Sequence, residues 1–164
     1  MLEVLNLTKR KVCARSLRKI AEAFLKKYKI KDAEISLVLI GDKRSRTLNQ
    51  KYRNKNYVTD VLSFPNQSFN LGGKHSLVNS NFLGEIFINL TEISRLKKYE
   101  EMFLELEEIL GDKILSSSKA AREKYLLHFI FVHGLLHLLG FDDKKEEERK
   151  KMLLLGAKFL KCYN

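Results

Sequence analysis

Residues 133–143 read His133-Gly134-Leu135-Leu136-His137-Leu138-Leu139-Gly140-Phe141-Asp142-Asp143. The apolar run predicts a helix on which His133 and His137, four residues apart, lie on the same face. Gly140 can adopt a left-handed conformation, end this helix and turn the chain back. Such a turn could bring Asp143 beside the two imidazoles. Three protein ligands and one open position are typical of a catalytic zinc site, because structural zinc sites usually have four protein ligands.

The sequence leaves two other interpretations of this stretch open. Asp142 could be the third ligand instead of Asp143, and the remaining carboxylate would then hold an imidazole N–H. The histidines could also simply fill the core, which is the role expected of the lone His128. We favour a shared metal because it satisfies both buried imidazoles at once. The nitrogen and oxygen ligands predict one Zn²⁺ per chain, although Mn²⁺, Ni²⁺ or Fe²⁺ would also fit.

The residue after the first histidine argues against a peptidase. Zinc peptidases with an H-E-x-x-H motif carry a glutamate there, which acts as the general base. In this chain that position is Gly134. A zinc-dependent, peptidase-like hydrolase therefore needs a base from elsewhere in the fold.

The pattern outside this stretch predicts one α+β domain over residues 1–164. It has a small mixed β-sheet packed with about five helices, and the histidines lie on a metal-site helix like that of the zincins. The predicted strands cover residues 2–7, 35–40, 61–64 and 82–90, and Pro65 ends the third. The predicted helices cover 15–28, 43–53, 91–110, the histidine helix after Ser116–Ser118, and 146–162. Residues 66–81 are rich in Asn, Ser and Gly and predict a long loop.

The net charge of +11 is concentrated in residues 1–60, which hold 16 Lys and Arg against 6 Asp and Glu. A basic surface attracts polyanions by counterion release, so nucleic acid is the leading candidate partner. A basic protein with no nucleic-acid role would have the same charge. Cys13 and Cys162 lie too far apart to indicate a disulfide framework or a zinc knuckle.

No segment predicts a membrane partner. The longest apolar stretch has 14 residues, whereas a membrane span needs about 20. Basic residues interrupt the N-terminal segment, which therefore lacks the pattern of a signal peptide. We expect a cytoplasmic protein.

Three ordered blocks between residues 49 and 152 carry a family resemblance. The first is Asn49-x-x-Tyr52-Arg53 followed by TDVLSFP at residues 59–65, and the second is LGEI at residues 83–86. The third is the histidine stretch followed by Glu148 and Met152. Together they resemble the signature of the YbeY family of metal-dependent bacterial endoribonucleases, whose third block reads H-G-x-L-H-L-x-G-Y-D-H.

The resemblance implies a function and partners. It implies hydrolysis of single-stranded RNA, with roles in maturing the 3′ end of 16S rRNA and in quality control of the small ribosomal subunit. Single-stranded or ribosomal RNA and that subunit are then the expected partners. A non-enzymatic RNA-binding ribosome assembly factor with a structural metal is the main alternative.

The resemblance also implies site residues. Arg53, which by residue type alone is a surface arginine on a basic helix, becomes a catalytic residue that clamps the phosphate. Tyr52 or Tyr57 could stack on a base, although core packing is expected of both. One position departs from the family pattern: Asp143 stands where the family has its third histidine. Zinc accepts a carboxylate at a similar distance, but the added negative charge should make the ion a weaker Lewis acid.

Overall fold

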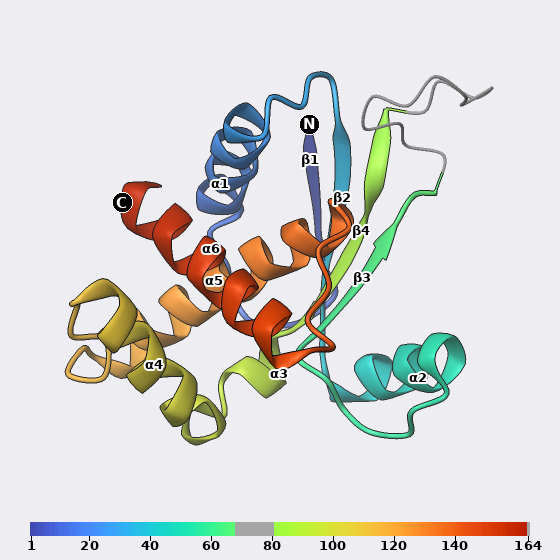
Figure 1. The fold of residues 1–164 in the computed structure, drawn as a ribbon. Helices are drawn as coiled ribbons and strands as arrows, with labels where there is room; N and C mark the ends of the chain where they lie inside the picture. The colour runs from blue at the N-terminus through green and yellow to red at the C-terminus, as the bar shows by residue number, and fades with distance from the viewer. Residues whose placement is uncertain (68–80, 164) are drawn as a thin grey trace.

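The structure, a computed structural model, describes residues 1–67 and 81–163 and has the predicted α+β architecture (Figure 1). The first half contains β1 (Leu2–Asn6), α1 (Ala14–Lys27), β2 (Glu34–Ile40), α2 (Asp42–Arg53), β3 (Val61–Pro65) and β4 (Phe82–Asn89). The second half contains α3 (Leu90–Ile93), a 3-10 helix (Leu96–Tyr99), α4 (Glu100–Leu110), α5 (Lys119–Leu138) and α6 (Glu146–Tyr163). Most of the loop predicted for residues 66–81 lies outside the described residues.

The four strands form one mixed sheet in the order β1-β2-β4-β3. The strands β1, β2 and β4 are parallel, and β3 pairs with β4 in the antiparallel direction. Pro65 pairs with Gly84 and is the last residue of β3. The prediction that Pro65 stops the strand was therefore wrong by one residue. An edge strand tolerates proline because one side of it needs no backbone donor.

The main core lies between one face of the sheet and the helices α1, α5 and α6 (Figure 1). The side chains of β2 and β4 that face it are fully buried, namely Leu37, Leu39, Ile86 and Ile88. Burial of each such side chain contributes about 1.5–3 kcal/mol. This packing fixes α5, which carries both histidines, against the sheet.

Helix α2 packs on β3 and β4 through an aromatic contact. The ring centroids of Tyr52 and Phe64 lie 5.0 Å apart, and those of Phe64 and Phe87 lie 5.8 Å apart. The prediction that Tyr52 and Tyr57 pack in the core is wrong, since they are 56% and 52% exposed. Only one side of α2 meets the sheet, so Tyr52 remains accessible to solvent, and Tyr57 lies in the loop after the helix.

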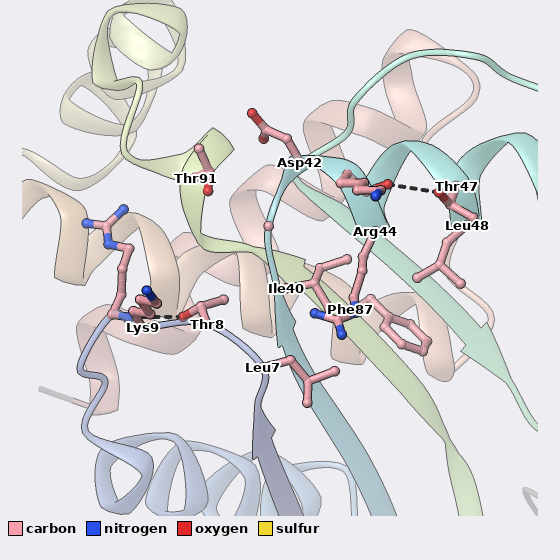
Figure 2. Close-up of a pocket in the computed structure, with 13 residues that line it drawn as sticks. Leu7, Thr8, Lys9, Ile40, Asp42, Arg44, Thr47, Leu48, Phe87 and Thr91 are labelled. Atoms are coloured by element: carbon pink, nitrogen blue, oxygen red, sulfur yellow. Dashed lines mark hydrogen bonds between the residues drawn. The ribbon is translucent and has the colours of Figure 1, made fainter.

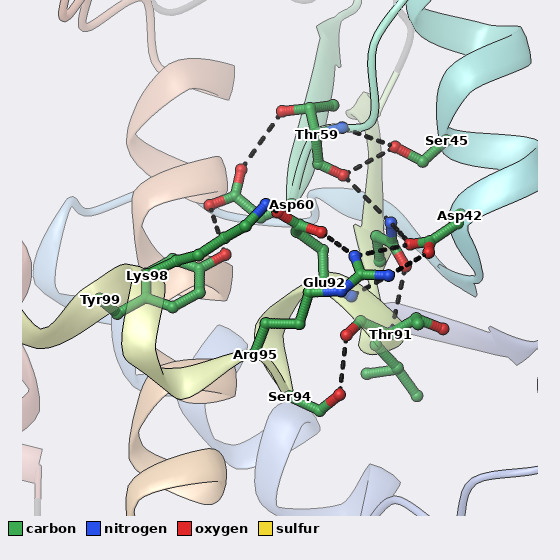
Figure 3. Close-up of polar contacts among 12 residues, drawn as sticks. Asp42, Ser45, Thr59, Asp60, Thr91, Glu92, Ser94, Arg95, Lys98 and Tyr99 are labelled. Carbon is green, nitrogen blue, oxygen red and sulfur yellow. Dashed lines mark hydrogen bonds and ion pairs between the residues drawn. The ribbon is translucent and has the colours of Figure 1, made fainter.

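The helix predicted for residues 91–110 is interrupted, and Asn89 rather than Thr91 caps its first turn. The side chain of Arg95 turns away to donate to Asp42 at 2.5 Å, and the Tyr99 hydroxyl donates to Asp60 at 3.2 Å (Figure 3). Glu92 is buried and forms ion pairs with Arg95 and Lys98. These contacts override the local helical preference, which is a weak determinant by itself.

Two further sequence expectations concern the cysteines and the membrane. Cys13 and Cys162 are both free and exposed. Within residues 1–67 and 81–163, no helix has the length and apolar character to cross a bilayer.

His128 is a packed residue of α5, as predicted, and it makes the fold sensitive to acid. It is buried, and its Nε2 lies 3.2 Å from Oγ of Ser16. Burial, assisted by the charge of Lys124, lowers the pKa of His128 to about 4. The unfolded chain therefore binds more protons than the folded chain between about pH 6.5 and 4, and acid favours unfolding in that window.

We expect the free energy of unfolding to fall by up to about 3 kcal/mol between pH 6.5 and 4 because of His128. Urea denaturation of the wild type and of His128→Gln at both pH values would measure it. The variant should lose less stability on acidification than the wild type. Equal losses would show that His128 does not titrate in this way.

Candidate metal centre

Helix α5 and the turn after it bring the predicted ligands together. Ser118 caps the start of this helix, and its hydroxyl accepts from the Ala121 N–H at 3.2 Å. Gly140 has the predicted positive φ, of 87°, and its N–H donates to the carbonyl of His137 at 2.9 Å. The chain then reverses, so that Asp143 returns to the last turns of α5.

Three side-chain atoms converge at the end of α5. The two Nε2 atoms of His133 and His137 lie 3.1 Å apart, and Oδ2 of Asp143 lies 3.3 and 3.7 Å from them. A tetrahedral ion with ligands at about 2.0–2.1 Å separates any two of them by about 3.3 Å. The triangle formed by His133, His137 and Asp143 therefore fits such an ion, and these residues form a possible metal-ligand group.

The environment of His137 keeps a lone pair on Nε2. Its Nδ1 lies 2.9 Å from the carbonyl oxygen of Phe141, which can only accept, so Nδ1 carries the proton. An outer hydrogen bond of this kind fixes the ring of a metal-binding histidine. Burial, and then the neighbouring His133, lower the pKa of His137. The ring is thus held in the neutral form that metal binding requires.

The two carboxylates after the turn have different partners. The hydrogen bond with His133 lowers the pKa of Asp143 to about 2, so this group is ionised at neutral pH. Asp142 instead accepts from Nζ of Lys144 at 2.7 Å and from the backbone N–H of Asp143 at 2.9 Å. The geometry therefore favours Asp143 over Asp142 as the third ligand.

A cavity of about 790 Å³ opens beside the three ligand atoms. Arg53, from the C-terminal end of α2, lines this cavity together with Lys55 and Lys144. Arg53 is exposed, and no carboxylate of residues 1–67 and 81–163 pairs with it. An unpaired guanidinium near a metal-ligand group can bind a phosphate in a bidentate manner.

Two buried polar residues of α2 hold the segment that follows Arg53. The amide of Asn49 donates to the carbonyl of Tyr57 at 2.9 Å. The hydroxyl of Ser45 donates to the carbonyl of Thr59 at 2.7 Å and accepts from its N–H at 3.0 Å (Figure 3). Both Ser45 and Asn49 are 1% exposed. The role of the asparagine in the N-x-x-Y-R block is thus to anchor the loop between α2 and β3.

Comparison with known proteins identifies the family. A family model described as Endoribonuclease YbeY matches residues 4–164, nearly the whole chain. The chain belongs to the endoribonuclease YbeY family. The Endoribonuclease YbeY of Mycoplasma capricolum is 32% identical over 134 residues, which cover 81% of this chain and 68% of that protein. The one of an Anaeromyxobacter species is 36% identical over 132 residues, which cover 80% of this chain and 55% of that protein.

A solved structure supports the fold. The solution structure of TM1509 from Thermotoga maritima matches with a TM-score of 0.54 and 20% identity, covering 98% of this chain and 89% of that one. At this identity the likeness concerns the fold alone. It agrees with the mixed sheet and the surrounding helices described above.

Gly134, which follows His133 in this YbeY-family chain, lies close to the sheet. A Cβ atom at Gly134 would lie 3.0 Å from Cγ2 of Ile86 and 3.2 Å from Oγ of Ser63. Position 134 therefore faces the sheet at a close approach of α5, and the side chains of Ile86 and Ser63 would have to shift to admit a longer residue. A glutamate at this position would be crowded by the sheet.

Three cavity residues escaped the sequence reasoning: Asp60, Ser63 and Tyr99. Asp60 accepts from the Val61 N–H at 2.8 Å and from the Tyr99 hydroxyl at 3.2 Å (Figure 3). Burial, and then the charge of Asp60, raise the pKa of Tyr99 well above its usual range. Oγ of Ser63 has no hydrogen-bond partner in the part of the chain that the structure describes. The TDVLSFP block was the available signal for Asp60 and Ser63, and nothing in the sequence indicated Tyr99.

Proposed function

We propose that this chain is a metal-dependent endoribonuclease that cleaves single-stranded RNA and takes part in ribosomal RNA processing. One observation carries the proposal. In a chain of the YbeY family, three convergent ligand atoms and an unpaired arginine line the same cavity. A metal site beside a bidentate phosphate-binding group suits the hydrolysis of a phosphodiester, because the two can oppose the charge that develops on the phosphate.

Each residue of the proposed site has a distinct task. His133, His137 and Asp143 would hold the metal ion, which supplies an acidified water or polarises a phosphoryl oxygen when bound. Arg53 would bind the non-bridging oxygens of the scissile phosphate and oppose the charge that develops on them. Asp142 lines the cavity too and is the candidate proton acceptor for the attacking water.

The finer assignments rest on the donor set and on the family. We propose Zn²⁺ as the ion, since two imidazoles and one carboxylate with an open position suit it best. We propose the small ribosomal subunit as the partner, the 3′ end of 16S rRNA as the substrate and the cytoplasm as the compartment. We also propose that residues 1–164 act as one domain, which the extent of the family match supports.

The alternatives make different predictions. The space-limited position of Gly134 disfavours a peptidase that uses a neighbouring glutamate. A non-enzymatic assembly factor would bind single-stranded RNA in a strongly salt-dependent manner without cutting it. Incubation with a labelled single-stranded RNA and with its duplex, each with Zn²⁺ or with a chelator, separates these cases. Zn²⁺-dependent cleavage of the single strand supports the proposal, and binding without cleavage contradicts it.

Replacing Arg53 with alanine is expected to lower kcat for single-stranded RNA about 100-fold, because one charge-stabilising donor contributes this order of magnitude. The affinity for Zn²⁺ should not fall, since Arg53 is outside the ligand group. Cleavage kinetics and metal titration would measure the two quantities. The fold should be unaffected because Arg53 is exposed and no described carboxylate pairs with it.

Arg53→Lys is the matched control for this prediction. It keeps the charge but loses the planar pair of donors, so it should recover only part of the activity. If Arg53→Ala cleaves as fast as the wild type, the arginine is a surface residue and has no part in the reaction.

A further inference from the structure

A second cavity, of about 930 Å³, lies between the segment after β1 and the beginning of α2 (Figure 2). We call it the basic groove, and it is separate from the cavity of the metal ligands. Four of its lining residues are cationic, namely Lys9, Arg10, Lys43 and Arg44. Only one lining residue, Asp42, is acidic.

The charge of the basic groove is mostly uncompensated. Within residues 1–67 and 81–163, no carboxylate pairs with Lys9, Lys43 or Arg44. The carboxylate of Asp42 is occupied by Arg95 at 2.5 Å, and this hydrogen bond lowers the pKa of Asp42. In Figure 2 the Asp42 side chain points away from that of Arg44. At Lys9, Lys43 and Arg44 the groove therefore presents positive charge without a paired carboxylate, which favours a polyanion.

Hydrogen bonds within the protein fix the wall of the groove that residues 6–10 form. The Asn6 amide donates to the carbonyl of Arg10 at 2.8 Å, and the Asn6 Oδ1 accepts from the N–H of Thr8 at 2.9 Å. The Arg10 guanidinium donates to the carbonyl of Leu90 and to Glu123, both at 2.6 Å. A preorganised wall lowers the entropic cost of binding.

The floor of the groove is apolar. It is formed by Leu7, Ile40, Leu48 and Phe87, and Figure 2 shows Arg44 extending over it from α2. Leu7 is 41% exposed although it is apolar, and Phe87 is half-buried. Single-stranded nucleic acid needs this combination, because cations follow its backbone while its bases pack on apolar or aromatic surfaces.

We propose that the basic groove binds a segment of single-stranded RNA away from the cleavage site, with phosphates on Lys9, Lys43 and Arg44 and a base over Leu7 and Phe87. This inference rests on the proposed function, since it assigns the same substrate to a second surface. Helix α2 links the two sites: Arg44 lies in the groove and Arg53 in the metal cavity. Nine residues of helix separate them by about 13 Å.

The triple variant Lys9→Glu/Lys43→Glu/Arg44→Glu tests the proposal in the full chain. Glutamates in the first turn of α2 favour the helix dipole, and cleavage of a dinucleotide by the variant reports whether its fold is intact. We would measure the affinity for a labelled oligonucleotide of about 16 nucleotides by fluorescence anisotropy, with a chelator present to prevent cleavage. The Kd should rise at least about tenfold. The negative slope of log K against log salt should become shallower by about 2, since each of the three lost phosphate contacts contributes about 0.7.

Lys151→Glu/Lys158→Glu on the exposed side of α6 is the control, because it also reverses charges but lies outside the groove. It should keep a Kd and a salt slope close to those of the wild type. Zn²⁺-dependent cleavage of an RNA dinucleotide, which is too short to reach the groove, should be equal in the triple variant and the wild type. An RNA affinity unchanged by the triple variant overturns the proposal and leaves the groove to a protein partner. A wild type that binds RNA through the groove without cutting it would overturn only the nuclease assignment.

Discussion

His137→Ala is expected to abolish Zn²⁺-dependent cleavage of RNA and to weaken Zn²⁺ binding by more than about 100-fold. Changes to residues that merely support a ligand cost 10–100-fold, and His137 is itself a proposed ligand. Its Nε2 lies 3.1 Å from that of His133 and 3.7 Å from Oδ2 of Asp143, so its loss leaves only two ligand atoms. Metal titration followed by a cleavage assay would measure both effects.

His128→Gln is the matched control, because it removes another histidine of the same helix that lies outside the ligand group. This variant should bind Zn²⁺ as tightly as the wild type. If His137→Ala binds Zn²⁺ as tightly as the wild type, His137 is not a ligand, and a wild type that binds no Zn²⁺ would mean that the histidines fill the core.

Asp143→His tests the departure from the family pattern in the same assays. It restores three ligands, so it should bind Zn²⁺, whereas Asp143→Ala should lose most of the affinity. Protons compete with the metal ion for a histidine side chain near its ordinary pKa of about 6.5. They compete for the Asp143 carboxylate only near its pKa of about 2. Binding to the histidine variant should therefore weaken more steeply below about pH 6.5. Equal affinities in Asp143→Ala and the wild type would remove Asp143 from the ligand group.

Local patterns were enough to predict the element that carries the two proposed histidine ligands. The spacing of His133 and His137 fixed their common face, and Gly140 has the positive φ that the turn required. The four strands were also predictable, because their apolar runs are short and end at turn-forming residues. Each of these inferences depends on a few neighbouring residues, and the tertiary structure agrees with the local preference.

Contacts between distant segments could not be predicted in the same way. Tyr99 reaches Asp60 across 39 residues, and Arg95 reaches Asp42 across 53. These bonds break the helix that periodicity predicted for residues 91–110 and bring Tyr99 into the cavity of the proposed metal site. The place of Arg53 in that cavity was expected only from the family resemblance, because spacing does not relate α2 to α5.

Gly84→Ala is expected to lower the free energy of unfolding by about 3 kcal/mol, and Tm by roughly 6–12 °C. Gly84 has a φ of +149°, and a Cβ atom there would lie 2.5 Å from the carbonyl oxygen of Phe64 and 2.8 Å from Cδ2 of Leu138. The first contact is with backbone of the paired strand β3, which cannot move without breaking the sheet. Thermal and urea denaturation would measure the loss.

Gly111→Ala separates the steric contribution from that of backbone conformation. Gly111 has a φ of +70° with nothing within 4 Å of a Cβ atom, so its replacement should cost only about 1–2 kcal/mol. Gly84→Ala should also weaken Zn²⁺ binding, because its clash falls on Leu138, next to His137 in the last turn of α5. Gly111→Ala should leave Zn²⁺ binding unchanged, because no atom lies within 4 Å of its Cβ position. If both variants lose the same stability and keep the same Zn²⁺ affinity, the close approach of β4 to α5 at Gly84 does not position the metal ligands.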